Sequence, residues 1–123
     1  MEFVHTCYRI TDPERSVAFY EALGLEMRRE MPIREEAMNY FLGVPGKPGP
    51  ELELTYNFGV GSYELGTAYG HIALTVEDMA GTLERLAEQG IVPERPPYTI
   101  REGGSQICFV RDPDNYRIEL IEH

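Results

Sequence analysis

The sequence has few cysteines, few basic residues and no long hydrophobic run. Two cysteines are too few for a disulfide framework, so we expect free thiols in a reducing cytoplasm. The 11 basic residues are outnumbered by 21 acidic ones, and the net charge of −10 argues against nucleic acid as a partner. No stretch of 18 apolar residues exists, and residues 1–6 lack the basic and apolar regions of a signal peptide, so we expect no membrane association.

The length of the chain limits how many folded units it can form. A chain of 123 residues can build one substantial core but is short for two independent ones. Its composition, 42% hydrophobic and 26% charged, is that of an ordinary globular protein. We therefore expect a single domain over residues 1–123. Any repeated units of about 60 residues must pair with each other or with a second chain, because units of that size are marginal alone.

The histidines reveal an internal repeat. Four residue types recur 66 positions apart: His5 and His71, Asp12 and Asp78, Gly24 and Gly90, Glu53 and Glu119. Each of these histidines is thus followed 48 residues later by a glutamate, and the only other histidine is the C-terminal His123. Two equivalent His–Glu pairs, one in each half, are the simplest way to build a metal site on a pseudo-twofold axis.

Each half of the repeat has the pattern of a strand, a helix and further strands. Residues 3–10 alternate as a strand that puts His5, Cys7 and Arg9 on one face. A helix is expected between an N-capping aspartate and a terminating glycine, at 12–24 in the first half and 78–90 in the second. The other strands are expected at 38–42, 51–56, 70–76, 105–110 and 116–121. We predict an α+β fold of two βαβββ modules, 1–58 and 70–123, with a linker at 59–69.

The four repeated histidines and glutamates have the chemistry of a metal site. Imidazole nitrogen and carboxylate oxygen suit borderline and hard divalent cations, whereas thiolates would indicate structural zinc or iron–sulfur. Two glutamates balance the charge of a divalent ion, and four ligands leave two positions of an octahedron open, as in catalytic sites. A gene duplication would also preserve the spacing of structural residues, so the spacing favours a metal site without establishing it.

Three stretches carry recognisable motifs: His5-Thr6-x-x-Arg9, the run from Glu53-Leu54-Thr55-Tyr56-Asn57 through Tyr63-Glu64-Leu65-Gly66 to Gly70-His71, and Asp112-Pro113-Asp114-x-Tyr116-x-Ile118-Glu119. They resemble glyoxalase I, the lactoylglutathione lyase of the vicinal oxygen chelate superfamily. The last stretch marks only the wider superfamily, while the central run is more specific. Together they span nearly the whole chain.

The resemblance implies a set of site residues. The metal ligands would be His5, Glu53, His71 and Glu119, the residues that the repeat selects independently. Family modules pair across a homodimer, so each of two sites would combine one chain's first pair with the other chain's second pair. Arg9 and Asn57 match positions that hold the carboxylate of glutathione. The compact length resembles the bacterial class that works best with nickel or cobalt rather than zinc.

The implied reaction is the isomerisation of the hemithioacetal of methylglyoxal and glutathione to S-D-lactoylglutathione, through an enediolate, which detoxifies methylglyoxal. A metal-ligating glutamate would move the proton between neighbouring carbons. Glu119 is the first choice for this base. Glu53 is its pseudo-symmetric counterpart, and the sequence does not separate the two.

The sequence is also compatible with other functions. Another thiol could replace glutathione, because Arg101-Glu102-Gly103-Gly104 stands where many relatives have a lysine near a glycine pair. The same fold also supports metal-dependent epimerases and extradiol dioxygenases. A metal-free protein that binds small molecules is a third possibility, although it would have no need of both His–Glu pairs.

Overall fold

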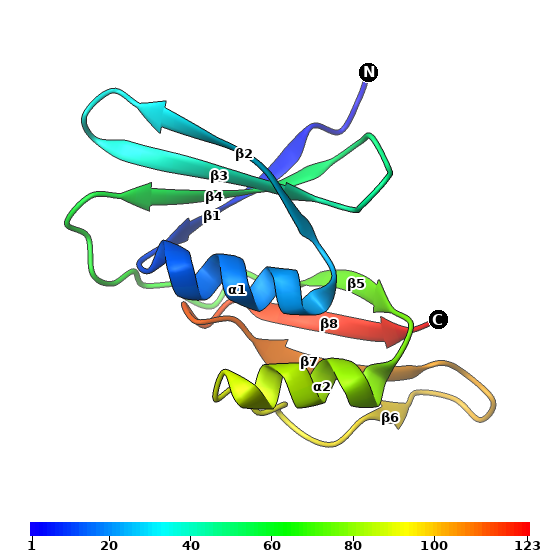
Figure 1. Cartoon of the computed structure of the whole chain (residues 1–123). Coiled ribbons are helices and arrows are strands. Elements are labelled where there is room, and N and C mark those ends of the chain that lie inside the picture. The colour runs from blue at the N-terminus through cyan, green and yellow to red at the C-terminus, as the bar shows by residue number, and fades with distance from the viewer. The chain divides into compact units, whose positions relative to one another are not determined.

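The computed structural model describes all 123 residues, which form two compact units, Met1–Glu64 and Leu65–His123. Each unit is one four-stranded sheet with one helix (Figure 1). The first unit comprises β1 (His5–Ile10), α1 (Pro13–Leu23), β2 (Glu26–Ile33), β3 (Ala37–Gly43) and β4 (Glu51–Asn57). The second comprises β5 (Ile72–Val76), α2 (Met79–Glu88), β6 (Tyr98–Thr99), β7 (Gln106–Arg111) and β8 (Arg117–Glu122). The predicted α+β fold of two βαβββ modules is confirmed.

The two sheets have the same topology. Strands follow the order β1-β4-β3-β2 in the first and β5-β8-β7-β6 in the second. The first strand of each unit pairs in parallel with the last, and all other neighbours are antiparallel. The last strand therefore lies between its two neighbours at the centre of the sheet, where it is paired along both sides.

Both helices begin at the predicted aspartates. The side chain of Asp12 accepts a hydrogen bond from the Arg15 amide at 3.2 Å, and that of Asp78 accepts one from the Gly81 amide at 3.1 Å. Gly24 ends α1 in the left-handed conformation, at φ 111°. Helix α2 ends slightly earlier than predicted, with Gln89 as its C-cap. Neither helix has the length and apolar character needed to cross a bilayer.

Strand alternation separates a buried face from an open face in each sheet. In the first unit, Tyr8, Ile10, Leu52 and Leu54 are buried, and Phe19, Tyr20 and Leu23 of α1 are buried with them. The residues between them on β1, namely His5, Cys7 and Arg9, are exposed, as the alternation predicted. In the second unit Ile118 and Leu120 of β8 and Met79 and Leu86 of α2 are buried. In the first unit, the open face of the sheet therefore carries the exposed side chains of β1 that can bind ligands.

The loop between β3 and β4 is held by an arginine of β2. Arg28 Nη2 donates hydrogen bonds to the carbonyl oxygens of Val44 at 2.7 Å and Lys47 at 2.6 Å. A side chain at Gly43 would collide with this guanidinium group, because a Cβ there would lie 2.3 Å from Arg28 Cζ. The held loop helps to fix the register in which β4 pairs with β3. This register sets the positions of Glu53 and Asn57, which lie on β4.

Candidate metal and substrate site

The first unit brings His5 and Glu53 together on the open face of its sheet. In the parallel pairing of β1 with β4, Cys7 lies opposite Glu53. His5 is two residues before Cys7 and therefore lies on the same face of the sheet. His5 Nε2 lies 2.8 Å from Glu53 Oε2. The imidazole is 40% exposed and the carboxylate 12% exposed, which leaves the histidine accessible from outside the sheet.

The second unit repeats this arrangement with His71 and Glu119, although His71 lies one residue before β5 and not within the strand predicted at 70–76. Ala73 of β5 lies opposite Glu119 of β8, as Cys7 lies opposite Glu53. His71 Nε2 lies 3.0 Å from Glu119 Oε1, and the two side chains are 37% and 16% exposed. The repeat in the sequence therefore corresponds to two His–Glu pairs in the same register and with nearly the same separation.

A phenylalanine supports each histidine. In the first unit Phe41 lies opposite Glu53, and its ring meets His5 edge to face, with centroids 6.3 Å apart. The guanidinium of Arg29 lies 3.9 Å from the centre of the Phe41 ring and is held by Glu51 at 3.2 Å. Arginine, phenylalanine and histidine thus form a column across the sheet.

The second unit has the same column with an arginine from a different strand. Phe109 lies opposite Glu119, and its ring centroid is 5.1 Å from that of His71. Arg117 of β8, not a residue of β6, lies 3.7 Å from the centre of the Phe109 ring. Sequence analysis missed both rings, because Phe41 and Phe109 are 68 residues apart and break the 66-residue repeat.

Glu94 anchors the column of the second unit. Its carboxylate accepts hydrogen bonds from Arg117 Nε and Nη2, both at 2.9 Å, and lies 3.2 Å from Arg111 Nε. The Arg117 hydrogen bond, aided by the charges of both arginines, lowers the pKa of Glu94 below its ordinary value. The bidentate geometry holds the guanidinium in the plane that stacks on Phe109.

Removing the Glu94 charge should make the fold less stable at neutral pH but not in acid. Because its pKa is lowered in the folded state, Glu94 stabilises the fold above the ordinary glutamate pKa, and this contribution is lost as pH falls through the lowered value. We expect Glu94→Gln to cost about 1 kcal/mol at neutral pH. Thermal unfolding at a series of pH values should show the two proteins converging in acid. Glu84→Gln, on the exposed face of α2, is the control and should match the original at every pH.

The structure places Arg9 and Asn57 on the face that carries His5 and Glu53. Arg9 lies two residues beyond Cys7 on β1 and opposite Thr55. Asn57 is the last residue of β4 and lies four residues after Glu53, on the same face of the strand. Its Nδ2 donates a hydrogen bond to the Tyr63 hydroxyl at 2.9 Å. A guanidinium and a fixed amide thus extend the polar surface from the His–Glu pair along the sheet.

Each His–Glu pair has donor atoms of the kinds that divalent metals bind. The structure contains no group of three or more potential metal ligands, and in each unit one imidazole nitrogen lies beside one carboxylate oxygen. Metal–nitrogen and metal–oxygen bonds of about 2.1 Å put neighbouring ligands of an octahedron about 3.0 Å apart. The observed separations of 2.8 and 3.0 Å are those of a hydrogen-bonded ion pair and are also close to that edge, so each pair is compatible with neighbouring ligand positions around an ion.

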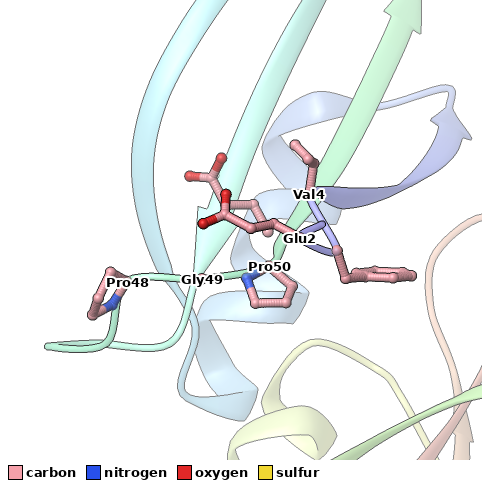
Figure 2. A pocket seen from close by; sticks show the side chains of 7 residues that line it. Glu2, Val4, Pro48, Gly49 and Pro50 are labelled. Atoms are coloured by element: carbon pink, nitrogen blue, oxygen red, sulfur yellow. The ribbon is translucent and has the colours of Figure 1, made fainter.

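Two hollows of the first unit lie away from the His–Glu pair. Figure 2 shows one of them, where Glu2 and Val4 of the N-terminal segment approach the Pro48-Gly49-Pro50 loop. The other lies between α1 and the strands β2 and β3, and Tyr40 is part of its wall. Neither includes His5, Arg9, Glu53 or Asn57. The His–Glu pair of the first unit is therefore separate from both of these hollows.

Comparison with known proteins assigns the family. Residues 2–120 match the model of the glyoxalase/bleomycin resistance protein/dioxygenase superfamily. The chain is 44% identical to the lactoylglutathione lyase of Salmonella typhimurium, over 99% of this chain and 93% of that protein. It is 42% identical to the lactoylglutathione lyase GLX1 of Arabidopsis thaliana, over 98% of this chain, but spans only 44% of the plant protein's length.

A solved structure gives the same assignment. The trypanothione-dependent glyoxalase I of Leishmania major superposes with a TM-score of 0.82 at 38% identity, covering 99% of this chain and 86% of that one. The predicted resemblance is confirmed at the level of both sequence and fold. The chain belongs to the glyoxalase I (lactoylglutathione lyase) family of this superfamily.

Proposed function

We propose that the chain is a glyoxalase I that converts the hemithioacetal of methylglyoxal and glutathione into S-D-lactoylglutathione. The observation that carries this proposal is the presence of two equivalent His–Glu pairs, one in each unit, in a chain so similar to bacterial lactoylglutathione lyases. A binding protein without a metal would have no use for either pair. The proposal also accounts for the arginine and asparagine beside the first pair.

The ligands of the proposed metal are His5, Glu53, His71 and Glu119. Glyoxalase I enzymes are generally metal-dependent, and the nitrogen–oxygen donor set suits nickel or cobalt, with zinc as the weaker choice. When bound, the ion would act as a Lewis acid and stabilise negative charge that develops on the two neighbouring oxygens of the substrate. Each His–Glu pair would keep its carboxylate beside the imidazole, so that both donors face the same ion.

Glu119 is the proposed base. It would take the proton from the carbon that bears the hydroxyl and sulfur and return it to the neighbouring carbonyl carbon. The hydroxyl proton would pass from the first oxygen to the second, so that the first carbon becomes the thioester carbonyl and the second bears the new hydroxyl. The only side chain that the Glu119 carboxylate contacts by an ion pair or hydrogen bond is His71. The Glu53 carboxylate contacts both His5 and Thr55. Fewer fixed contacts favour Glu119 for a role in which the carboxylate reorients between two carbons.

Arg9 and Asn57 are the proposed thiol-binding residues. A guanidinium binds a carboxylate through charge-assisted hydrogen bonds, and glutathione has two carboxylates. The hydrogen bond from Asn57 to Tyr63 fixes the amide and leaves its oxygen to accept a bond from an ammonium group. These features suit the γ-glutamyl end of glutathione, which carries both groups.

The proposed site combines the first pair of one chain with the second pair of its partner in a homodimer. Ligands from a single unit number only two, which is too few for a catalytic metal site. Twofold symmetry would then give two identical sites per dimer. The open faces that carry the pairs would be closed from solvent by this assembly, as catalysis through a charged intermediate favours.

The test is activity after removal and replacement of metal. We expect chelator-treated protein to lose isomerase activity on the methylglyoxal–glutathione hemithioacetal, because metal-held oxygens are central to the proposal. Nickel or cobalt should restore it, and zinc should restore less, when thioester formation is followed by ultraviolet absorbance. Protein that binds a metal but stays inactive with glutathione would contradict the proposed substrate. Protein that binds no metal would contradict the proposed ligands.

A further inference from the structure

A chain of polar side chains lies behind Glu53 on the open face of the first sheet. Thr55 follows Glu53 by one alternation step, and its Oγ1 lies 3.4 Å from Glu53 Oε1. The same hydroxyl lies 2.7 Å from Asn39 Oδ1 and 3.3 Å from Cys7 Sγ. Asn39 is only 6% exposed and lies opposite Thr55 in the pairing of β3 with β4. Glu53 thus has one oxygen on His5 and the other on Thr55.

The orientation of the Asn39 amide decides where the Thr55 proton goes. A hydroxyl has one proton to donate, so Thr55 cannot serve both Asn39 and Glu53 as donor. The oxygen and nitrogen of an amide occupy nearly equivalent positions, and Asn39 can present its NH₂ group to Thr55 instead. Asn39 then donates to Thr55, and Thr55 donates to Glu53. An ionised carboxylate is the stronger acceptor, which favours this direction whenever Glu53 is charged.

The second unit lacks this support at every corresponding position. Ile121 follows Glu119 as Thr55 follows Glu53, and Ile107 lies opposite Ile121 as Asn39 lies opposite Thr55. Ala73, opposite Glu119, takes the place of Cys7. None of these three side chains can donate a hydrogen bond to a carboxylate. The two His–Glu pairs are alike in their own geometry and unlike in what lies behind them.

From this difference we infer that Thr55, backed by Asn39, is a positioning residue that fixes Glu53 as a metal ligand. A carboxylate held at both oxygens loses its freedom to rotate, so less order has to be imposed when an ion binds. The apolar residues behind Glu119 leave that carboxylate free to turn. This inference rests on the proposed function, because it presupposes an ion at Glu53. It adds two residues, Thr55 and Asn39, to those that determine how tightly the ion is held.

The affinity for cobalt(II) tests this role. Thr55→Val keeps the branched shape of the side chain but removes the hydroxyl. We expect it to weaken cobalt binding by about tenfold or more, the usual effect of losing a group that orients a ligand. Thr55→Ser retains the hydroxyl and should restore most of the affinity. The measurement is titration of the metal-free full-length protein, with the visible spectrum of bound cobalt as a second readout that changes when a ligand shifts.

Matched variants distinguish positioning from loss of folding. Ile121→Val places the same valine at the corresponding position of the second unit without removing a hydrogen-bonding group, and should leave cobalt affinity unchanged. The double variant Thr55→Val/Asn39→Leu removes both polar partners, so that no buried amide is left unpaired by the test. It should still unfold cooperatively on heating and should bind cobalt as weakly as Thr55→Val alone.

Two outcomes would overturn the inference, and they differ. If the unaltered protein binds cobalt and Thr55→Val binds it equally well with the same visible spectrum, the positioning role is wrong while the proposed metal site stands. If the unaltered protein binds no cobalt, both the positioning role and the proposed ligand set are wrong.

Discussion

Glu119→Gln is expected to lower kcat on the methylglyoxal–glutathione hemithioacetal by about 10²–10⁴-fold, the usual contribution of a general base. Glutamine preserves the size of the side chain and an oxygen that can still face a metal. It cannot take a proton from carbon. The assay should use nickel-loaded protein whose metal content has been measured, so that loss of a ligand is not mistaken for loss of the base. Turnover equal to that of the unaltered protein would exclude Glu119 as the base.

The corresponding change in the first unit separates the two glutamates. Glu53→Gln should act chiefly through metal binding, because the Glu53 carboxylate is already held by His5 and Thr55. At saturating nickel we expect it to retain more activity than Glu119→Gln. A larger loss for Glu53→Gln in fully loaded protein would exchange the proposed roles. Glu84→Gln, remote from both pairs on α2, should match the original in activity and metal content.

Mixing two inactive variants should restore activity. His5→Ala and His71→Ala each remove one proposed ligand, and each alone should form dimers with no complete site. In a mixed dimer, one site contains both alanines and the other contains both original histidines. Random exchange at equal concentrations makes half of the dimers mixed, so about a quarter of the sites should be intact. Isomerase activity after subunit exchange should rise from background to about that fraction.

The same experiment identifies where a complete site is assembled. If both His–Glu pairs of one chain met in a single site, every site in the mixture would lack one histidine and activity would stay at background. Restoration therefore supports sites shared between chains. Mixing each variant with itself is the control, and size-exclusion chromatography should verify that the mixed sample exchanges subunits.

The strands that carry the proposed ligands could be predicted from the sequence, because they obey a simple alternation. On β1 the exposed residues His5, Cys7 and Arg9 alternate with buried Tyr8 and Ile10. The capping aspartates could be predicted as well, since a helix start needs only a local acceptor. These features depend on neighbours in the chain and not on the pairing of distant strands.

Two of the four edge strands, β2 and β6, could not be located in this way. β2 has the sequence EMRREMPI, and most of it is exposed, so no buried face imposes a two-residue period. β6 is only Tyr98–Thr99 and follows a proline-rich segment. An edge strand needs little burial, because it is paired on one side only. Such strands depend on the sheet that accepts them more than on their own composition.

The residues that contact the proposed ligands could not be identified from the sequence, for a different reason. Asn39 and Thr55 meet because β3 and β4 pair in a register set by the loop between them. The repeat could not identify them, since their counterparts in the second unit are Ile107 and Ile121. The arginines on the two phenylalanine rings were hidden in the same way, because they come from β2 in one unit and β8 in the other.

The different origins of those arginines limit how the halves of the gene could be recombined. Glu51, which pairs with Arg29 and lies 3.6 Å from Arg28, corresponds by the 66-residue offset to Arg117. A chimera that replaced β4 by the sequence of β8 would keep the glutamate ligand but place a third guanidinium beside Arg28 and Arg29, and of the carboxylates that pair with these arginines only Glu26 would remain. The glutamate at position 53 would be kept in such an exchange, but the column of Arg29, Phe41 and His5 would be disrupted. Each half has its own charge partners, and a working hybrid would need Glu94 or its equivalent transferred together with the strand.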